Sequence, residues 1–89
     1  MVRQKIIVWN KLGIHLRPAT LLSKSATDFD SKISLKANDK CVNVKSVLGL
    51  LGAGVRQDDQ VEIICEGPDE EEALRRIIKL IRDGLGDTD

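Results

Sequence analysis

Two segments of the chain alternate apolar and polar residues with the period of two that is typical of a half-buried β-strand. In residues 60–66, Val61, Ile63 and Cys65 share one face, and residues 31–37 alternate in the same way. Residues 2–9 are apolar and β-branched enough for a further strand. Asn38-Asp39 is a hairpin signal, so residues 41–44 are expected to form the returning strand.

Three other segments carry apolar residues at helical spacing. The first is expected over residues 16–28, with Pro18 in its first turn, where the missing N–H costs nothing. Ser46 can cap a short apolar helix over residues 47–51. The third follows residues 67–69, and its acidic first turn and basic later turns match the helix dipole. Its expected buried stripe consists of Ala73, Leu74, Ile77, Leu80 and Ile81.

The order β-α-β-β-α-β-α predicts an α+β open-faced sandwich, in which three helices cover one face of a four-stranded antiparallel sheet. We expect residues 1–89 to form a single domain. The other sheet face is then open to solvent, and Ile7, Trp9 and Ile64 are expected to point there. Scattered apolar surface residues are normal, whereas a contiguous patch would indicate a partner or dimer contact.

The composition excludes several classes of protein. A hydrophobic content of 42% with 31% charged residues is typical of a folded globular chain. No apolar run approaches the roughly 20 residues that span a membrane, and a signal peptide is not evident, so we expect a cytoplasmic protein without membrane insertion. Cys41 and Cys65 are interpreted as free thiols. Because His15 is the only histidine, we expect no metal site, and no motif calls for a cofactor.

The charge is unevenly distributed along the chain although it sums to zero. Residues 1–56 contain 10 Lys and Arg against 3 Asp and Glu, and residues 57–89 contain 4 against 11. The half that contains His15 could therefore attract anions or acidic partner proteins, unless the two halves simply form solvated surfaces. Nucleic acid is not an expected partner, because the basic residues are scattered and the only aromatic residues are Trp9 and Phe29.

The residues around His15 combine the features of an anion site. A helix that begins at Leu16 points its first free N–H groups at the side chain of the preceding residue, which is His15. Arg17 adds a guanidinium suited to phosphate oxygens, and Gly13 permits a tight turn before the helix. From these residues alone, His15 is either a phosphoryl acceptor or an ordinary helix-capping or surface residue.

Residues 10–19, which read NKLGIHLRPA, resemble the active-site signature of the HPr family, the histidine-containing phosphocarriers of the phosphoenolpyruvate-dependent phosphotransferase system. Residues 45–51 resemble the serine segment of that family, and the similarity extends over essentially the whole chain. The resemblance implies that enzyme I phosphorylates His15 at Nδ1 and that an enzyme IIA-type protein accepts the group. It also implies that Arg17 contacts the phosphoryl group, and that the backbone N–H groups of Leu16 and Arg17 stabilise it. Such a protein is a carrier with no independent turnover, and we expect a monomer.

Three questions stay open at this point. Leu16 stands where the family usually has alanine, which keeps the backbone N–H but adds an apolar side chain beside the imidazole. Ser46 is either a helix cap alone or also the target of a serine kinase, whose phosphate would repel acidic partners. The branch is either sugar uptake, which Lys45-Ser46 favours, or the nitrogen-related branch, which residues 10–13 and 67–74 favour. The alternative to a carrier in sugar uptake is a regulatory phosphocarrier or binding module that is not coupled to sugar transport. The apolar and polar residues expected to dock partners, rather than to lie wholly in the core, are Thr20, Leu21, Val47, Leu48 and Leu51.

Overall fold

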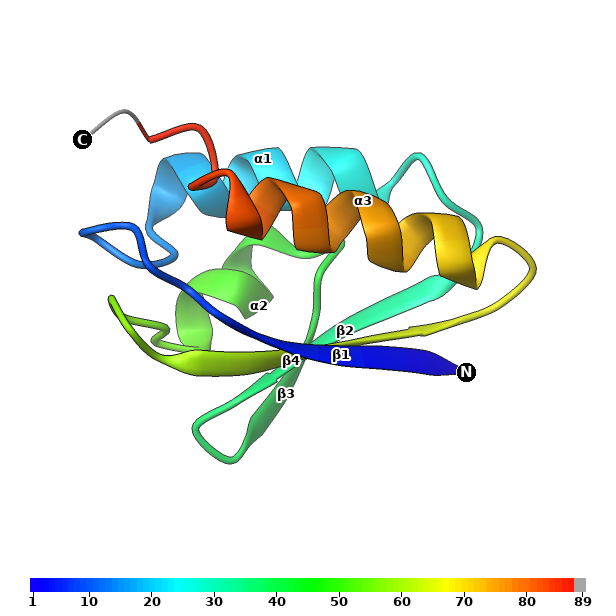
Figure 1. Ribbon diagram of the computed structural model, residues 1–89, viewed down its shortest axis with the longest axis horizontal. Coiled ribbons are helices and arrows are strands. Elements are labelled where there is room, and N and C mark those ends of the chain that lie inside the picture. The colour runs from blue at the N-terminus through cyan, green and yellow to red at the C-terminus, as the bar shows by residue number, and fades with distance from the viewer. Residues whose placement is uncertain (88–89) are drawn as a thin grey trace.

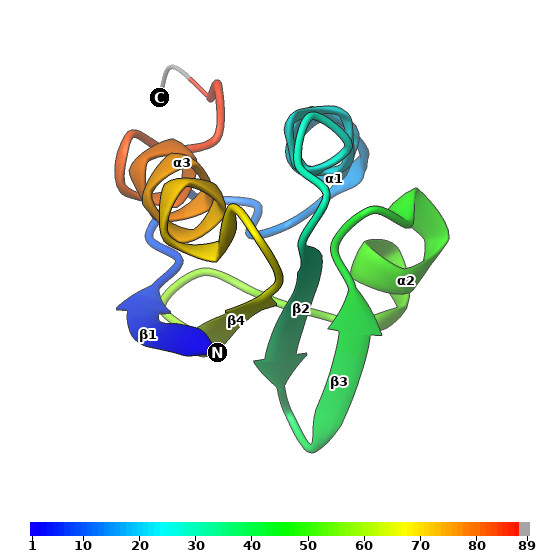
Figure 2. The same cartoon turned by 90° about the vertical axis from the view of Figure 1, so that its right-hand side faces the viewer.

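The computed structural model describes residues 1–87, and it has the expected β-α-β-β-α-β-α order (Figure 1). The elements are β1 (Val2–Ile7), α1 (Leu16–Ala26), β2 (Lys32–Ala37), β3 (Lys40–Asn43), α2 (Val47–Gly52), β4 (Gln60–Glu66) and α3 (Glu70–Arg82). The strands pair antiparallel in the order β1-β4-β2-β3. Figure 2 shows α1 and α3 side by side over the sheet and α2 beside β3, so the predicted open-faced sandwich is confirmed.

The central strand β4 has the most regular alternation of burial. Val61, Ile63 and Cys65 are buried against the helices, whereas the residues between them are only half-buried. Ile63 lies opposite Leu35 of β2 on one side and Gln4 of β1 on the other. Burial, with smaller contributions from neighbouring carboxylates, raises the pKa of the Cys65 thiol to about 11, so this free cysteine stays protonated at neutral pH.

The first strand is shorter than predicted, and Trp9 does not belong to the open face of the sheet. The strand β1 ends at Ile7, after which Val8 exchanges backbone hydrogen bonds with Asp58 and Asp59 rather than with a strand. The chain then turns away, and the Trp9 indole donates from Nε1 to the carbonyl of Arg82 at 2.9 Å. The prediction that Trp9 points to the open face is therefore wrong, because the indole packs at the end of α3.

Ile7 and Ile64 do not form a contiguous patch on the open face. Ile7 lies opposite Gln60, and Ile64 lies opposite Arg3, four residue pairs further along the same ladder. Arg3 in turn forms an ion pair with Glu62 at 3.8 Å, which places charges between the two isoleucines. This face therefore carries scattered apolar residues of the ordinary kind.

The buried stripe of α3 is rotated slightly from its predicted position. Ala73, Ile77 and Ile81 are fully buried as expected, but Leu74 and Leu80 are only partly buried. Ile78, which the prediction omitted, is buried instead. Within residues 1–87, no helix is long and apolar enough to cross a membrane.

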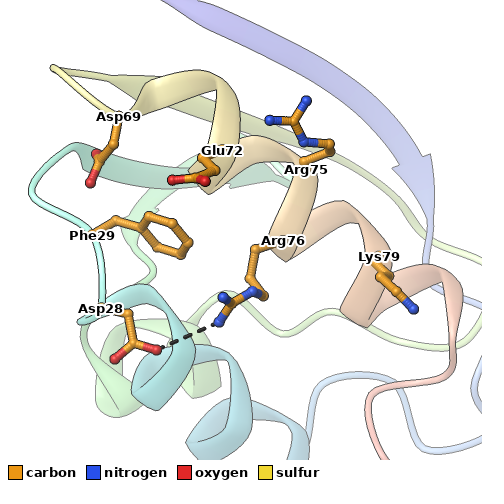
Figure 3. Close-up of a pocket in the computed structure, with 7 residues that line it drawn as sticks. All are labelled: Asp28, Phe29, Asp69, Glu72, Arg75, Arg76 and Lys79. Atoms are coloured by element: carbon orange, nitrogen blue, oxygen red, sulfur yellow. Dashed lines mark ion pairs between the residues drawn. The ribbon is translucent and has the colours of Figure 1, made fainter.

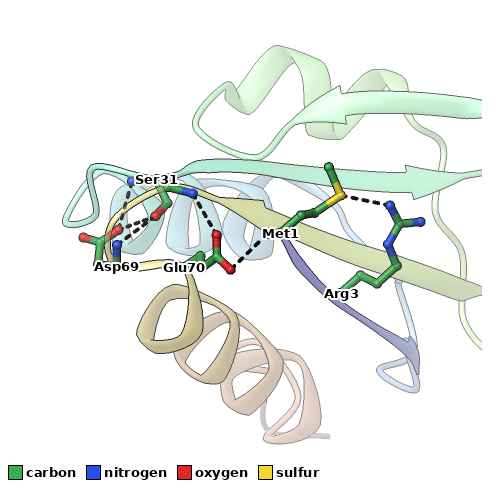
Figure 4. A network of polar contacts seen from close by, with 6 residues as sticks. Met1, Arg3, Ser31, Asp69 and Glu70 are labelled. Atoms are coloured by element: carbon green, nitrogen blue, oxygen red, sulfur yellow. Dashed lines mark hydrogen bonds and ion pairs between the residues drawn. The ribbon is translucent and has the colours of Figure 1, made fainter.

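A network of polar contacts fixes the start of α3 against the start of β2 (Figure 4). The carboxylate of Asp69 accepts hydrogen bonds from the backbone N–H groups of Asp30 and Ser31 and from the Ser31 hydroxyl. These bonds, that of the Ser31 hydroxyl foremost, lower the pKa of Asp69. Glu70 accepts a hydrogen bond from the N–H of Gly67 and forms an ion pair with the N-terminal amine at 3.1 Å. The network therefore joins the start of α3 both to the residues before β2 and to the N-terminus before β1.

Candidate functional site

His15 occupies the N-cap position of α1. Its backbone is extended, with φ −95° and ψ −166°, and its carbonyl accepts the first helical hydrogen bond, from Ala19 at 2.9 Å. Pro18 has no N–H, so the unpaired donors of the first turn are the N–H groups of Leu16 and Arg17, which find no acceptor among residues 1–87. The histidine side chain does not cap the helix itself. Two backbone donors and the positive end of the helix dipole therefore remain available beside the imidazole.

The loop before His15 is held against the loop that precedes β4. Gly13 adopts a φ of +64°, and a Cβ at this position would lie 2.3 Å from the carbonyl oxygen of Val55. The next residue, Ile14, donates its N–H to the same oxygen at 3.1 Å and is buried. Only glycine satisfies both the backbone conformation and the close approach.

The imidazole of His15 contacts a carboxylate from the far end of the chain. His15 Nε2 lies 3.3 Å from Oδ2 of Asp87, in the segment that returns from α3 to the start of α1 (Figure 1). The same Oδ2 accepts a hydrogen bond of 2.9 Å from the amide of Asn10, which also donates to the Gly13 carbonyl at 2.6 Å. The bond from Asn10, followed by the contact with His15, lowers the pKa of Asp87 despite some desolvation.

Sequence reasoning did not assign Asn10 or Asp87 to the site. Asn10 opens the stretch 10–19 that resembles the HPr signature but was given no role, and Asp87 belongs to the acidic half of the chain, 72 residues from His15. No local pattern connects them, because they meet only once the helices have packed. The acidic and basic halves of the sequence are therefore not separate surfaces at this point of the molecule.

Arg17 lies in the exposed first turn of α1. Its positive charge contributes to the lowering of the Asp87 pKa, which places it within electrostatic range of the carboxylate beside His15. The two residues that the sequence singled out, His15 and Arg17, are thus brought to the same end of α1.

Ser46 is the N-cap of α2, as predicted, and its hydroxyl accepts the N–H of Gly49 at 3.0 Å. The helix α2 contacts α1, and the Ser23 hydroxyl of α1 donates to the carbonyl of Lys45 at 2.8 Å. The Lys45 amine reaches the carbonyl of Phe29 at 2.7 Å. The serine segment is therefore attached to α1, the helix whose N-cap is His15.

The five residues expected to dock partners differ widely in exposure. Leu48 is 81% exposed and Leu51 37%, and Thr20 is also exposed, with its hydroxyl bonded to the Leu16 carbonyl. Leu21 and Val47 are half-buried, and Val47 packs against the core. Two exposed leucines close to His15 in the sequence were not among the expected docking residues, namely Leu12 at 69% and Leu16 at 61%.

A groove elsewhere on the molecule is not part of this site (Figure 3). It runs along the outer face of α3 beside Asp28 and Phe29. The Arg76 guanidinium lies over the Phe29 ring at 5.3 Å and pairs with Asp28 at 3.5 Å. Among residues 1–87, no group of three or more His, Cys, Asp and Glu could hold a metal ion.

The fold and the histidine at the start of α1 define a class of small phosphoryl-carrying proteins, and comparisons with known proteins agree. Residues 2–83 match the family model described as the PTS HPr component phosphorylation site. The chain is 39% identical to HPr-C-His from Thermoanaerobacter tengcongensis, with a TM-score of 0.94 and 99% of each chain covered. It is 30% identical to the histidine-containing phosphocarrier protein of Mycoplasma, with a TM-score of 0.89, covering 94% of this chain and 97% of that one.

A third relative is named for catabolite repression. The Bacillus subtilis protein Crh is 36% identical, with a TM-score of 0.76, and 98% of this chain covers 100% of that one. Its crystal structure is described as a dimer with a swapped domain. The chain belongs to the HPr family of the phosphotransferase system, whose members are phosphocarriers and not independently turning-over enzymes.

Proposed function

We propose that His15 receives a phosphoryl group on Nδ1 from phosphoenolpyruvate-charged enzyme I and passes it to enzyme IIA-type proteins, in the cytoplasmic steps of sugar uptake. The observation that carries this proposal is the place of His15 at the N-cap of α1, beside the unpaired N–H groups of Leu16 and Arg17. An imidazole at such a position is a nucleophile next to a ready anion site. Membership of a phosphocarrier family supplies the reaction.

The transfer needs no group other than those of the carrier and its partners. The electron pair of Nδ1 attacks the phosphorus of the donor, the N–P bond forms, and the bond from phosphorus to the donor breaks. The backbone N–H groups of Leu16 and Arg17 and the guanidinium of Arg17 bind the phosphoryl oxygens. In the second transfer the N–P bond breaks, and the acceptor takes the group. One helix end stabilises an anion by about 0.3–2 kcal/mol, which holds the group without trapping it.

We place partner docking on the exposed side chains around His15, on α1 and α2. Thr20, Leu48 and Leu51 are accessible, and Leu12 and Leu16 extend the apolar area on the other side of the histidine. Leu16 replaces the alanine usual in the family, and we propose that it changes the choice of partner rather than the chemistry. We propose that residues 1–89 act as one domain and one monomer, which sedimentation at working concentration would test against the dimers of the relatives.

Phosphorylation by enzyme I tests the central proposal. The protein is mixed with enzyme I and phosphoenolpyruvate, and intact mass is recorded before and after acid treatment. We expect one acid-labile phosphoryl adduct, absent from His15→Ala, and a rate about tenfold lower in Arg17→Ala because one phosphate-binding group is lost. An adduct that persists in His15→Ala, or no adduct on the wild-type protein, would contradict the proposal. Transfer to purified acceptors of the sugar and nitrogen branches then distinguishes the two.

A regulatory role through Ser46 is the second candidate, because the chain is also similar to a protein named for catabolite repression. A phosphate on Ser46 would add about −1.5 to −2 charges beside the docking surface. Ser46→Asp tests this effect, since aspartate also caps helices well and leaves α2 intact, and Ser46→Asn is the neutral control. We expect slower phosphorylation of His15 only in Ser46→Asp. Equal rates in both variants would count against the regulatory role.

A further inference from the structure

The His15 imidazole has one nitrogen that is already engaged before any partner binds. Nε2 faces Oδ2 of Asp87 at 3.3 Å, and the carboxylate is mostly buried, with 12% of its side chain exposed. An ionised carboxylate only accepts hydrogen bonds, so a proton between these two atoms belongs to Nε2. The nitrogen left with a free electron pair is then Nδ1.

The carboxylate of Asp87 does not rest on His15 alone. Asn10 is only 1% exposed, and its amide nitrogen donates both to Asp87 and to the Gly13 carbonyl. Both partners are acceptors, so the NH₂ group must face them, which fixes the orientation of the amide. The side-chain oxygen Oδ1 of Asn10 is buried without a hydrogen-bond partner among residues 1–87.

The unpaired Oδ1 of Asn10 lowers the stability of the folded protein. Buried polar atoms without a partner are rare in folded proteins and lower their stability. Here the Asn10 amide nitrogen donates to both Asp87 and the Gly13 carbonyl, while the amide oxygen accepts no hydrogen bond. A residue that served the turn alone would not need its second N–H bond to Asp87.

We propose that Asp87, held by Asn10, is a positioning residue for phosphoryl transfer: it accepts the Nε2–H of His15, keeps the electron pair on Nδ1, and balances the positive charge that the ring acquires when the N–P bond forms. The inference rests on the function proposed above. Arg17, whose positive charge makes a smaller contribution to the lowered pKa of this carboxylate, lies in the first turn of α1. In this proposal the Asp87 carboxylate acts on the imidazole, and the Arg17 guanidinium acts on the transferred phosphoryl group.

Asp87→Asn tests the role, with Asp83→Asn as the matched control. Asparagine has nearly the shape of aspartate but no charge. Asp83 lies in the same segment, is exposed, and pairs with Lys79 rather than with His15. Because the chain has a single histidine, the ¹⁵N spectrum of the labelled imidazole belongs to His15 without ambiguity.

Two measurements are made on each protein, after thermal unfolding has shown that both variants are folded. The first is the exchange of the Nε2 proton with water and the ¹⁵N shifts of the ring, which do not depend on any partner. The second is the initial rate of phosphorylation by enzyme I. We expect Asp87→Asn to show faster proton exchange, altered ring shifts and a rate of phosphorylation about three- to tenfold lower, a modest loss because the histidine is partly exposed to solvent. Asp83→Asn should match the wild-type protein in both.

The outcomes separate this inference from the proposed function. An unchanged rate in Asp87→Asn overturns the positioning role, whether or not the ring spectrum changes. A lower rate with an unchanged spectrum also overturns it, since the loss then comes from docking. If the wild-type protein accepts no phosphoryl group, the proposed function fails, while the spectrum still reports whether Asp87 holds the Nε2 proton.

Discussion

Gly13 determines where His15 lies more strictly than any other residue in the loop before α1. Its φ is in the left-handed region, and the space that a Cβ would occupy is filled by the backbone of Val55 and Arg56. Backbone atoms cannot turn aside as a flexible side chain can. The conformation and the contact therefore act together on a single residue, two positions before the histidine.

Gly13→Ala should lower the free energy of unfolding by about 3 kcal/mol, combining the strain of a left-handed alanine with the overlap against Val55. Gly52→Ala is the control, because the space around that glycine is open and it lies in α2. There the change should be neutral or stabilising by about 0.5 kcal/mol. Urea unfolding of both variants makes the comparison. Equal losses would show that the Gly13 turn can shift away from Val55.

At the scale of elements, α3 is attached to the sheet by polar contacts at its first turn and by apolar packing along its length. The Asp69 carboxylate takes three hydrogen bonds from residues 30 and 31, although it is the residue that would normally cap α3. The carboxylate therefore connects α3 to the residues before β2 and does not cap the N-terminus of α3. A connection of this kind depends on the carboxylate being ionised.

The stability contributed by Asp69 should disappear in acid. Its pKa is lowered in the folded protein, so the contribution is complete above the ordinary aspartate value of about 4 and is lost as the pH falls through the lower folded-state value. Asp69→Asn should therefore be less stable than the wild-type protein at pH 7, and the difference should shrink towards pH 3. Urea unfolding at both pH values measures it.

Asp30→Asn is the control for this experiment, because only the backbone N–H of Asp30 takes part in the network. Its difference from the wild-type protein should be small at both pH values. A constant difference for Asp69→Asn between pH 7 and pH 3 would mean that the carboxylate contributes by shape and not by charge.

For the whole molecule, the net charge is zero and the sequence pI is about 6.6, so attraction to partners cannot come from an overall charge. An electrostatic attraction would have to come from how the charges are arranged. The basic half of the sequence provides α1, whose N-cap is His15, and the uncharged helix α2 that contacts it, whereas α3 begins with three glutamates. This charge distribution would orient the molecule near an acidic partner, with the His15 end towards that partner.

The rate of phosphorylation by enzyme I should therefore fall with ionic strength. At limiting enzyme I, we expect a decrease of about three- to tenfold between 0.05 and 0.5 M salt, because screening removes the steering of oppositely charged surfaces. Stopped-flow or quenched-flow rates measure the effect, with the unfolding free energy recorded at each salt concentration. A rate independent of salt would assign docking to apolar contacts such as those of Leu48.

The parts of the fold that were predicted correctly depend on short stretches of sequence. The start of α1, the cap at Ser46 and the Asn38-Asp39 turn, where both residues have a positive φ, are determined by neighbours within a few positions. The exact face of α3 was less predictable. Leucines and isoleucines alternate around that helix, and only packing against the sheet selects Ile78 over Leu80.

The incorrect or missing predictions all involve contacts between distant parts of the chain. The sequence predicts Trp9 at the end of a strand, but in the structure its indole donates to the carbonyl of Arg82, 73 residues further on. Asp87 meets Asn10 across 77 residues and His15 across 72. Spacing in a sequence cannot register such pairs. His15 and Arg17, in contrast, were proposed as site residues from neighbouring positions, a helix start, a cation and the resemblance of residues 10–19 to the HPr signature, and their role stays a prediction.

The place of Trp9 has a practical consequence for following this segment in solution. The chain has one tryptophan, and its ring lies against Gly84, where an added Cβ would come within 3.0 Å of it. Gly84 precedes Asp87 by three residues, so the indole is located at the root of the segment that reaches His15. Ultraviolet emission of the unlabelled protein would therefore shift to longer wavelength if that segment detached, and partner binding could be monitored without attaching a dye.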